Sequence, residues 1–304
     1  MFWNKLFGKK NKDKSTDSHP STTVGELKVV VLSDLGNIRT NNEDIGMFFR
    51  IADAEVASQK GYLLVVADGM GGHEAGEVAS RIAAETVSEY YYNAEASLST
   101  EKSLAKSLAA ANKRIYNMSA ANKMYKGMGT TCTCVAVVGD SIFFGHVGDS
   151  RAYLIRANQT IEQITTDHTY VQELVKNGEI SLEEAAHHPK RNILTNAMGT
   201  KPDTMVDTGV HRTKLGDGDR ILLCSDGLYE YVKDDEMVSI LQNRNLHEAA
   251  AIFIQEAKKR GGHDNITVVL AERNNKEEQP VEARIAQKET RDFEIPTTRE
   301  IELP

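Results

Sequence analysis

Short apolar runs rich in β-branched residues recur along the chain and predict a core built mainly of β-strands. Turn residues such as the Gly-Asp-Ser at 139–141 separate many of them. The runs are LKVVVLSD (27–34), DIGMFFRI (44–51), YLLVVAD (62–68), TCTCVAVVG (131–139), SIFFGHVGD (141–149), RAYLIRA (151–157), RILLCSD (220–226) and NITVVLAE (265–272).

Three segments instead show the i, i+3, i+4 spacing of helices with one buried face: residues 75–91, 104–118 and 247–260. They are grouped and do not alternate strictly with the strands. That order favours a layered α+β architecture over a doubly wound parallel sheet.

Bulk properties narrow the class of protein. The 304 residues are 40% hydrophobic, which is enough for one core of about 250 residues. A formal net charge of -8 argues against general binding to nucleic acid or anionic membranes. No window resembles a spanning helix and the first residues do not resemble a signal peptide, so we expect a cytoplasmic protein. Cys132, Cys134 and Cys224 lie in apolar runs and are expected to be reduced core residues.

Both ends of the chain differ in composition from the centre. Residues 1–23 contain five lysines among polar residues, and residues 273–304 are highly charged with little apolar content. Neither segment can bury enough surface to offset its ordering entropy, so we expect a disordered basic N-terminal tail and a disordered charged C-terminal tail. An alternative for residues 1–14 is weak attachment to a membrane surface, because apolar residues are interleaved with the lysines there.

Acidic residues recur where the apolar runs end or begin, in NNED, VVADG, HVGDSR, LLCSDG and GGHDN. Each Asp-Gly pair alone is also an ordinary turn signal. Five such corners together indicate more, because converging carboxylates repel one another unless a cation lies among them. Ligands that are all oxygen suit Mg²⁺ or Mn²⁺ and not zinc.

Seven separated motifs, in order, make the sequence similar to the metal-dependent protein phosphatases of the PPM or type 2C family in their bacterial form. The resemblance implies an α+β fold of two antiparallel β-sheets packed as a sandwich, with α-helices on both outer faces, over residues 24–272. The motifs are SDLGNIRTNNED, VVADGMGGHEAGEVAS, GMGTTCTCVAV, GHVGDSRAYLIR, TTDHTYVQELVKNGEI with HHPKRNILTNAMG, DRILLCSDGLYEYV and GGHDNITVVL.

The resemblance also assigns roles to residues. It implies two tightly bound Mn²⁺ or Mg²⁺ ions, a third that binds more weakly, and a water that attacks phosphorus. Gly71 and Gly72 are expected to let the backbone pass close to the site. The implied roles are Asp68 bridging the two ions, the Gly69 carbonyl at one of them, Asp226 and Asp264 at one ion, Glu43 and Asp44 at the other directly or through water, Asp149 at the third, Arg39 as the phosphate clamp and Asn265 as the residue that orients a carboxylate or water.

The sequence departs from the eukaryotic pattern at Met70, where those relatives have the histidine proposed as general acid. His73, His168 or a metal-bound water could protonate the leaving group instead. Residues 167–199 correspond to the family's flap beside the cleft and contain one short amphipathic helix by pattern.

The resulting prediction is a phosphoric monoester hydrolase that removes phosphate from phosphoserine and phosphothreonine in proteins. We expect a monomer that opposes a bacterial Ser/Thr kinase and has no nucleic-acid partner. Two alternatives stay open: a phosphatase acting on a regulator of an anti-sigma factor, and a catalytically inactive fold used as a binding module. The inactive reading predicts lost ligands, and the motifs retain all of them.

Overall fold

The structure is a computed structural model that describes residues 26–71 and 75–274. The strands of this part of the chain are β1 (Glu26–Asp34), β2 (Asp44–Arg50), β3 (Tyr62–Met70), β4 (Gly129–Thr130), β5 (Cys132–Val138), β6 (Ser141–Val147), β7 (Arg151–Ile155), β8 (Ile161–Gln163), β9 (Asp207–Val210), β10 (Arg220–Cys224) and β11 (Ile266–Asn274). The helices are α2 (Ala54–Lys60), α3 (Ala75–Tyr92), α4 (Thr100–Ala121), the 3₁₀ turn η1 (Lys123–Tyr125), α5 (Tyr170–Lys176), α6 (Leu182–Ala186), α7 (Asp226–Tyr229), α8 (Asp234–Leu241) and α9 (Leu246–Lys259).

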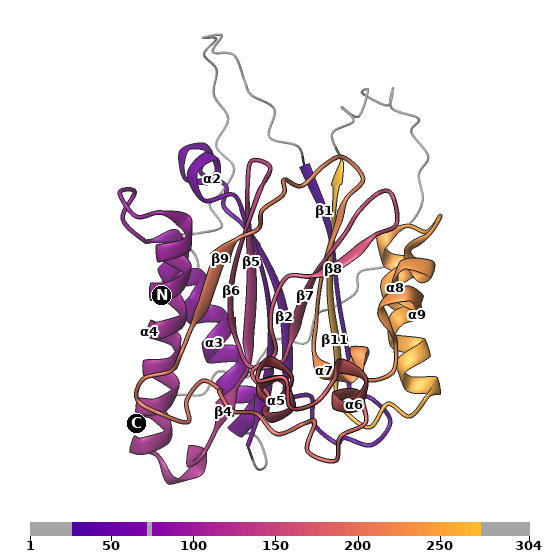
Figure 1. Cartoon of the computed structure of the whole chain (residues 1–304). Coiled ribbons are helices and arrows are strands. Elements are labelled where there is room, and N and C mark those ends of the chain that lie inside the picture. The colour runs from indigo at the N-terminus through magenta and orange to yellow at the C-terminus, as the bar shows by residue number, and fades with distance from the viewer. Residues whose placement is uncertain (1–25, 72–74, 275–304) are drawn as a thin grey trace, which may run out of the picture.

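The strands form two antiparallel sheets that face each other. One sheet has the order β1-β11-β10-β7-β8 and the other β2-β3-β5-β6-β9, with β4 paired to β3. Figure 1 shows α3 and α4 outside one sheet and α8 and α9 outside the other. The predicted α+β sandwich with helices on both outer faces is therefore confirmed.

Three apolar layers hold these elements together. The central layer lies between the sheets, where Leu64 and Val66 of β3 pack with Leu223 of β10 and Val269 of β11. The layer under α3 and α4 includes Leu63 and Val65, the alternate residues of β3. Because side chains alternate across a strand, β3 is apolar on both faces and reads as a continuous apolar run.

The layer under α8 and α9 explains why α9 forms where its periodicity predicts. Phe253 and Ala257 are fully buried there against Leu222 of β10 and Leu270 of β11. At the helix N-terminus, Asn245 and Glu248 form a reciprocal capping box that satisfies exposed backbone N–H groups.

The ends of several strands meet at one end of the sandwich, beside α5, α6 and α7 (Figure 1). The register of β2 and β3 places Asp44 directly opposite Asp68. Asp226 begins α7 immediately after β10, and Asp264 lies just before β11. Acidic residues at the strand ends of both sheets thus lie at the same end of the sandwich.

All eight apolar runs form strands, and the three periodic segments correspond to α3, α4 and α9. The pattern missed α2, α8 and the short strands β4, β8 and β9. The prediction of one helix in residues 167–199 was wrong, because α5 and α6 both form there. Each of these two helices buries a single side chain, Val171 or Ala185, so the apolar pattern there is weak.

The three cysteines are free and buried, as expected. The tail residues 1–23 and 275–304 lie outside the described residues, so their predicted disorder stays a prediction. Arg273 and Asn274, assigned to the C-terminal tail, are the last residues of β11 and pair with β1. No helix in the described ranges has both the length and the apolarity to span a bilayer.

Candidate active site

An acidic pocket of about 280 Å³ opens at the end of the sandwich where these strands meet. Carboxylates from five separate motifs and one arginine line it, together with Asn192 and Leu194 of the predicted flap. The lining residues are Arg39, Glu43, Asp68, Gly69, Met70, Gly71, Thr131, Asp149, Asn192, Leu194, Asp226, Asp264 and Asn265.

Asp68 lies within β3 and not after it, because the strand continues through Met70 by pairing with β4. Its backbone N–H donates to the Thr131 hydroxyl at 2.9 Å, and the Thr130 hydroxyl donates to its carbonyl at 2.9 Å. These bonds fix the backbone of Asp68, so the direction in which its carboxylate leaves the strand is set by the sheet.

The carboxylates of the pocket strongly perturb one another. The pKa of Asp68 is raised well above its ordinary value, first by burial and then by the charges of Asp44, Asp226, Asp149 and Asp264. Burial and the charge of Asp149 likewise raise the pKa of Asp226. Burial raises the pKa of Asp149 to about 7 and that of Asp44 to about 6. This pattern is typical of a cluster of like charges that lacks enough cationic partners.

Glu43 reaches the pocket through space that two glycines leave open. A Cβ added to Gly76, in the first turn of α3, would collide with the Glu43 carboxylate, and one added to Gly69 would collide with the Gly76 carbonyl. The N–H of Gly69 donates to the Glu43 carbonyl at 3.1 Å. The close backbone approach was expected at Gly71 and Gly72. Gly71 has φ +146° and Gly72 lies outside the described residues, whereas within this motif Gly69 and Gly76 make the close contacts.

Among the described residues, Arg39 is the one cation that lines the pocket, and its Nη2 lies 2.6 Å from Oδ2 of Asp264. The Arg39 side chain is 53% exposed, so it also faces solvent. Arg39 therefore neutralises one predicted metal ligand while offering its remaining N–H groups toward the pocket mouth.

Asn265 holds the loop that carries Arg39 and Glu43. Its Oδ1 accepts from the Glu43 backbone N–H at 2.8 Å, and its Nδ2 donates to the carbonyls of Leu35 and Asn41. Both functional atoms of the amide are thus occupied by backbone groups. The structure places Asn265 as a positioning residue for this loop.

The donor set fits a hard divalent cation. Every acidic side chain of the pocket supplies oxygen, and Oδ1 of Asp226 is buried without a hydrogen-bond partner. Within residues 26–71 and 75–274, no group of three or more His, Cys, Asp or Glu side chains is arranged so that it could hold a metal ion. The carboxylates line the pocket wall, and a cation among them would relieve their mutual repulsion and the unpaired Asp226 oxygen.

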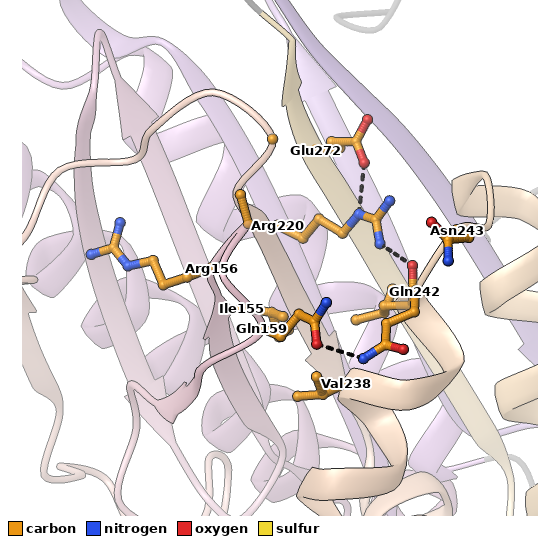
Figure 2. A pocket seen from close by; sticks show the side chains of 11 residues that line it. Ile155, Arg156, Gln159, Arg220, Val238, Gln242, Asn243 and Glu272 are labelled. Atoms are coloured by element: carbon orange, nitrogen blue, oxygen red, sulfur yellow. Dashed lines mark hydrogen bonds and ion pairs between the residues drawn. The ribbon is translucent and has the colours of Figure 1, made fainter.

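A second pocket of about 290 Å³, between the five-stranded sheet and α8, is similar in size but not in charge (Figure 2). Arg220 Nε donates to Glu272 at 2.6 Å, Arg156 pairs with Asp219 at 2.6 Å, and Gln242 donates to Gln159. Its charged groups are paired within the protein, whereas the acidic pocket has a large excess of carboxylates. Charge and not volume therefore distinguishes the candidate site.

The two histidine candidates for the leaving-group acid are placed differently. Met70, at the position where eukaryotic relatives have the histidine, lines the pocket and has no proton to give. His168 does not line it, since its Nδ1 accepts from the Gly148 N–H at 3.1 Å and its Nε2 contacts Asp207 at 3.1 Å. His73 lies outside the described residues.

Some pocket residues were not singled out from the sequence. Thr131 follows the GMGT motif, and Asn192 and Leu194 belong to the flap, which was named only as a segment. Asn192 donates to the Glu230 carboxylate at 2.8 Å, which ties the flap to the end of α7. In the sequence, these three residues could be found only because they lie in or beside a recognised motif, since they show no residue pattern of their own.

Comparisons with known proteins agree with this geometry. A family model described as protein phosphatase 2C matches residues 51–278. The chain belongs to the protein phosphatase 2C family.

Curated members of the family include a serine/threonine phosphatase stp of Listeria welshimeri, 42% identical over 80% of this chain and 94% of its own. The protein phosphatase PhpP of Streptococcus pneumoniae D39 is 33% identical over 83% of this chain and 99% of its own. Among solved structures, the serine/threonine phosphatase PstP/Ppp of Mycobacterium tuberculosis has a TM-score of 0.70 at 36% identity and covers 82% of this chain and 99% of its own. Another structure, of the PstP catalytic domain in complex with two manganese ions, has a TM-score of 0.67 at 34% identity and covers 82% of this chain and 98% of its own.

The raised pKa values predict how the metal-free protein responds to pH. Asp44 and Asp149 keep protons in the folded state up to about pH 6 and 7, but lose them near their ordinary value of 3.8 when unfolded. The folded state therefore binds more protons within this window, and its stability falls as pH rises through it, by on the order of 3 kcal/mol for Asp44 alone. Urea unfolding in EDTA should give a lower free energy of unfolding at pH 8 than at pH 5. Asp44→Asn should flatten this difference, and an unchanged slope in that variant would contradict the assignment.

Proposed function

We propose that this chain is a metal-dependent phosphatase that hydrolyses phosphoserine and phosphothreonine in proteins. The observation that carries the proposal is the acidic pocket, which is lined by Glu43, Asp68, Asp149, Asp226 and Asp264 beside one arginine. Asp44 lies opposite Asp68 without lining the pocket, and its charge acts on Asp68. Membership of the protein phosphatase 2C family supports it. So does the similarity to enzymes named serine/threonine phosphatase.

Some residues of the pocket would bind the metal ions through their charge, and others would set the positions of these ligands. Four other carboxylates act on Asp68, so it would help to hold both ions, whereas the Gly69 carbonyl would bind one of them. Asp226 and Asp264 would hold one ion and Glu43 with Asp44 the other, directly or through water. Mn²⁺ or Mg²⁺ bound there would lower the pKa of water and neutralise charge on the phosphoryl group.

Arg39 would bind the phosphoryl oxygens of the substrate. A guanidinium offers parallel N–H donors to such oxygens and stays charged at all working pH values. Its exposed position at the pocket mouth leaves it free to make these bonds while Asp264 holds its orientation.

Asp149 is the proposed ligand of a third, weaker ion. It is 7% exposed and begins a turn after β6, and the Tyr229 hydroxyl donates to its carbonyl at 3.0 Å. With Met70 at the position of a proton donor in eukaryotic relatives and His168 held away from the pocket, water near Asp149 is our candidate for protonating the leaving alkoxide.

The biological setting follows from this chemistry. A phosphoprotein phosphatase in a bacterial cytoplasm would reverse a Ser/Thr kinase in signal transduction. We propose a monomer, because the one catalytic pocket is complete within a single chain. Action on a regulator of an anti-sigma factor would use the same pocket, and only the substrate would differ.

Removal of metal should abolish activity. Hydrolysis of an aryl phosphate should require added Mn²⁺ or Mg²⁺ and stop in EDTA, because the carboxylates alone repel a phosphate dianion. Asp68→Asn should lower kcat by at least about 10³-fold while the protein stays folded by circular dichroism, given the size of electrostatic contributions in such sites. Full turnover after exhaustive chelation would exclude the metal-dependent mechanism.

Loss of the proposed phosphate clamp should weaken substrate binding and turnover together. Arg39→Ala should raise KM for a phosphopeptide and cost about 2 to 4 kcal/mol in kcat/KM, the range expected for charge-assisted bonds in a shielded site. Arg212→Ala, which removes a surface arginine paired with Glu162, is the matched control and should leave both constants unchanged. Wild-type kinetics in Arg39→Ala would exclude the clamp.

Asp149→Ala should slow the hydrolysis of two substrates to different extents, depending on how much protonation each leaving group needs. A serine alkoxide needs a proton and an activated aryl oxide needs little, so phosphopeptide hydrolysis should slow more than aryl phosphate hydrolysis. Calorimetry should show that the two tighter Mn²⁺ sites remain and the weaker one is lost. Equal losses on both substrates with all Mn²⁺ sites intact would indicate that Asp149 only shapes the turn after β6.

A further inference from the structure

Asp44 receives hydrogen bonds from the opposite sheet. The Ser225 hydroxyl, which follows β10, lies 2.6 Å from Oδ2 of Asp44 on β2. The same Ser225 oxygen accepts the backbone N–H of Thr267 at 3.0 Å. Since the backbone amide occupies the acceptor side of Ser225, its single proton points to Asp44.

The second hydroxyl that bonds Asp44 belongs to Thr267 of β11. Thr267 Oγ1 also lies 2.7 Å from Ser33 Oγ on β1, and the Asn42 amide nitrogen donates to Ser33 Oγ at 2.8 Å. An ionised Asp44 can only accept, so Thr267 gives its single proton to Asp44. The Thr267 oxygen then accepts from Ser33, whose own oxygen accepts from Asn42.

These bonds therefore form a hydrogen-bond chain with one direction, from Asn42 through Ser33 and Thr267 to Asp44. Ser225 donates a second hydrogen bond to Asp44 at the end of this chain. Ser225 and Thr267 are fully buried, so no solvent competes for these protons. A carboxylate has about four acceptor positions, and two hydroxyls leave the others for a cation. The arrangement requires Asp44 to be an acceptor on both bonds.

We propose that Ser225 and Thr267 are positioning residues that hold Asp44 ready to bind a divalent cation before the cation arrives. The inference rests on the metal site of the proposed function. Ser225 follows β10 and Thr267 lies in β11 of the five-stranded sheet, whereas Asp44 belongs to β2 of the other sheet. These hydrogen bonds thus set the position of Asp44 relative to Asp226, which follows β10, and Asp264, which precedes β11.

Two substitutions of Thr267 separate positioning from packing. Thr267→Val keeps the shape of the side chain and removes the hydroxyl. Thr267→Ser keeps the hydroxyl and removes the methyl group, which packs over Gly46 in the layer between the sheets. Ser225→Ala removes the other donor and serves as the independent variant if Thr267→Val does not fold.

The measurement is Mn²⁺ affinity by calorimetry, with urea unfolding in EDTA on the same samples. Thr267→Val and Ser225→Ala should each bind Mn²⁺ about 10- to 100-fold more weakly, the usual effect of losing a hydrogen bond to a metal ligand. Thr267→Ser should bind Mn²⁺ nearly as tightly as the wild type although it is less stable, because only its packing is reduced. With saturating Mn²⁺, Thr267→Ser should also recover the wild-type KM.

Two results would overturn the proposal: wild-type Mn²⁺ affinity in both Thr267→Val and Ser225→Ala, or affinity losses that follow stability, with Thr267→Ser the weaker binder. Turnover of a phosphopeptide by the wild-type protein is measured in parallel. A wild type that binds Mn²⁺ without turnover would contradict the proposed function alone, and the affinities of the variants would still decide the positioning role.

Discussion

The rest of the structure depends on one unfavourable contact, the placement of Asp44 directly opposite Asp68 on neighbouring strands. Side chains opposed in this way have Cβ atoms about 5 Å apart, and like charges there destabilise a sheet. Asp149, Asp226 and Asp264 add to the same field. A fold that keeps these groups together must obtain its stability elsewhere and needs a cation to relieve the repulsion.

The three apolar layers supply that stability, and they also explain the location of the site. Most residues of β3, β5, β7, β10 and β11 are buried, so polar groups gather where these strands end and loops cross. Both sheets end at the same place, so one pocket is lined by Glu43 before β2, Asp68 of β3, Asp226 after β10 and Asp264 before β11. Hydroxyl and amide side chains between them, from Ser225, Thr267 and Asn265, then fix the acids relative to one another.

Most of the fold and of the pocket could be predicted from the sequence, for an identifiable reason. The buried residues of strands such as β3 and helices such as α9 follow an apolar pattern that is visible in the sequence. The acidic motifs lie at the strand ends, where the resemblance assigns metal ligands. The roles of the site residues stay predictions, since the pocket contains the expected side chains but proximity does not identify a ligand. Features that depend on three-dimensional contact were missed: Gly76 is needed only because Glu43 lies against it, and the pairing of Arg39 with Asp264 joins residues 225 positions apart.

In the flap, too, the local sequence predicts some structural features and not the contacts between distant residues. Asn192 and Leu194 reach the pocket from a segment whose two helices, α5 and α6, bury only one side chain each. Segments with so little buried surface open at a lower cost in free energy than the core strands. Asn192 is tied to Glu230 by a single hydrogen bond, whereas Asp68 pairs with Asp44 on one side and bonds Thr130 and Thr131 on the other. The acidic side chain of Asp68 thus lies on a rigid part of the fold, whereas the flap residues that line the same pocket lie on a segment that opens at a lower cost in free energy.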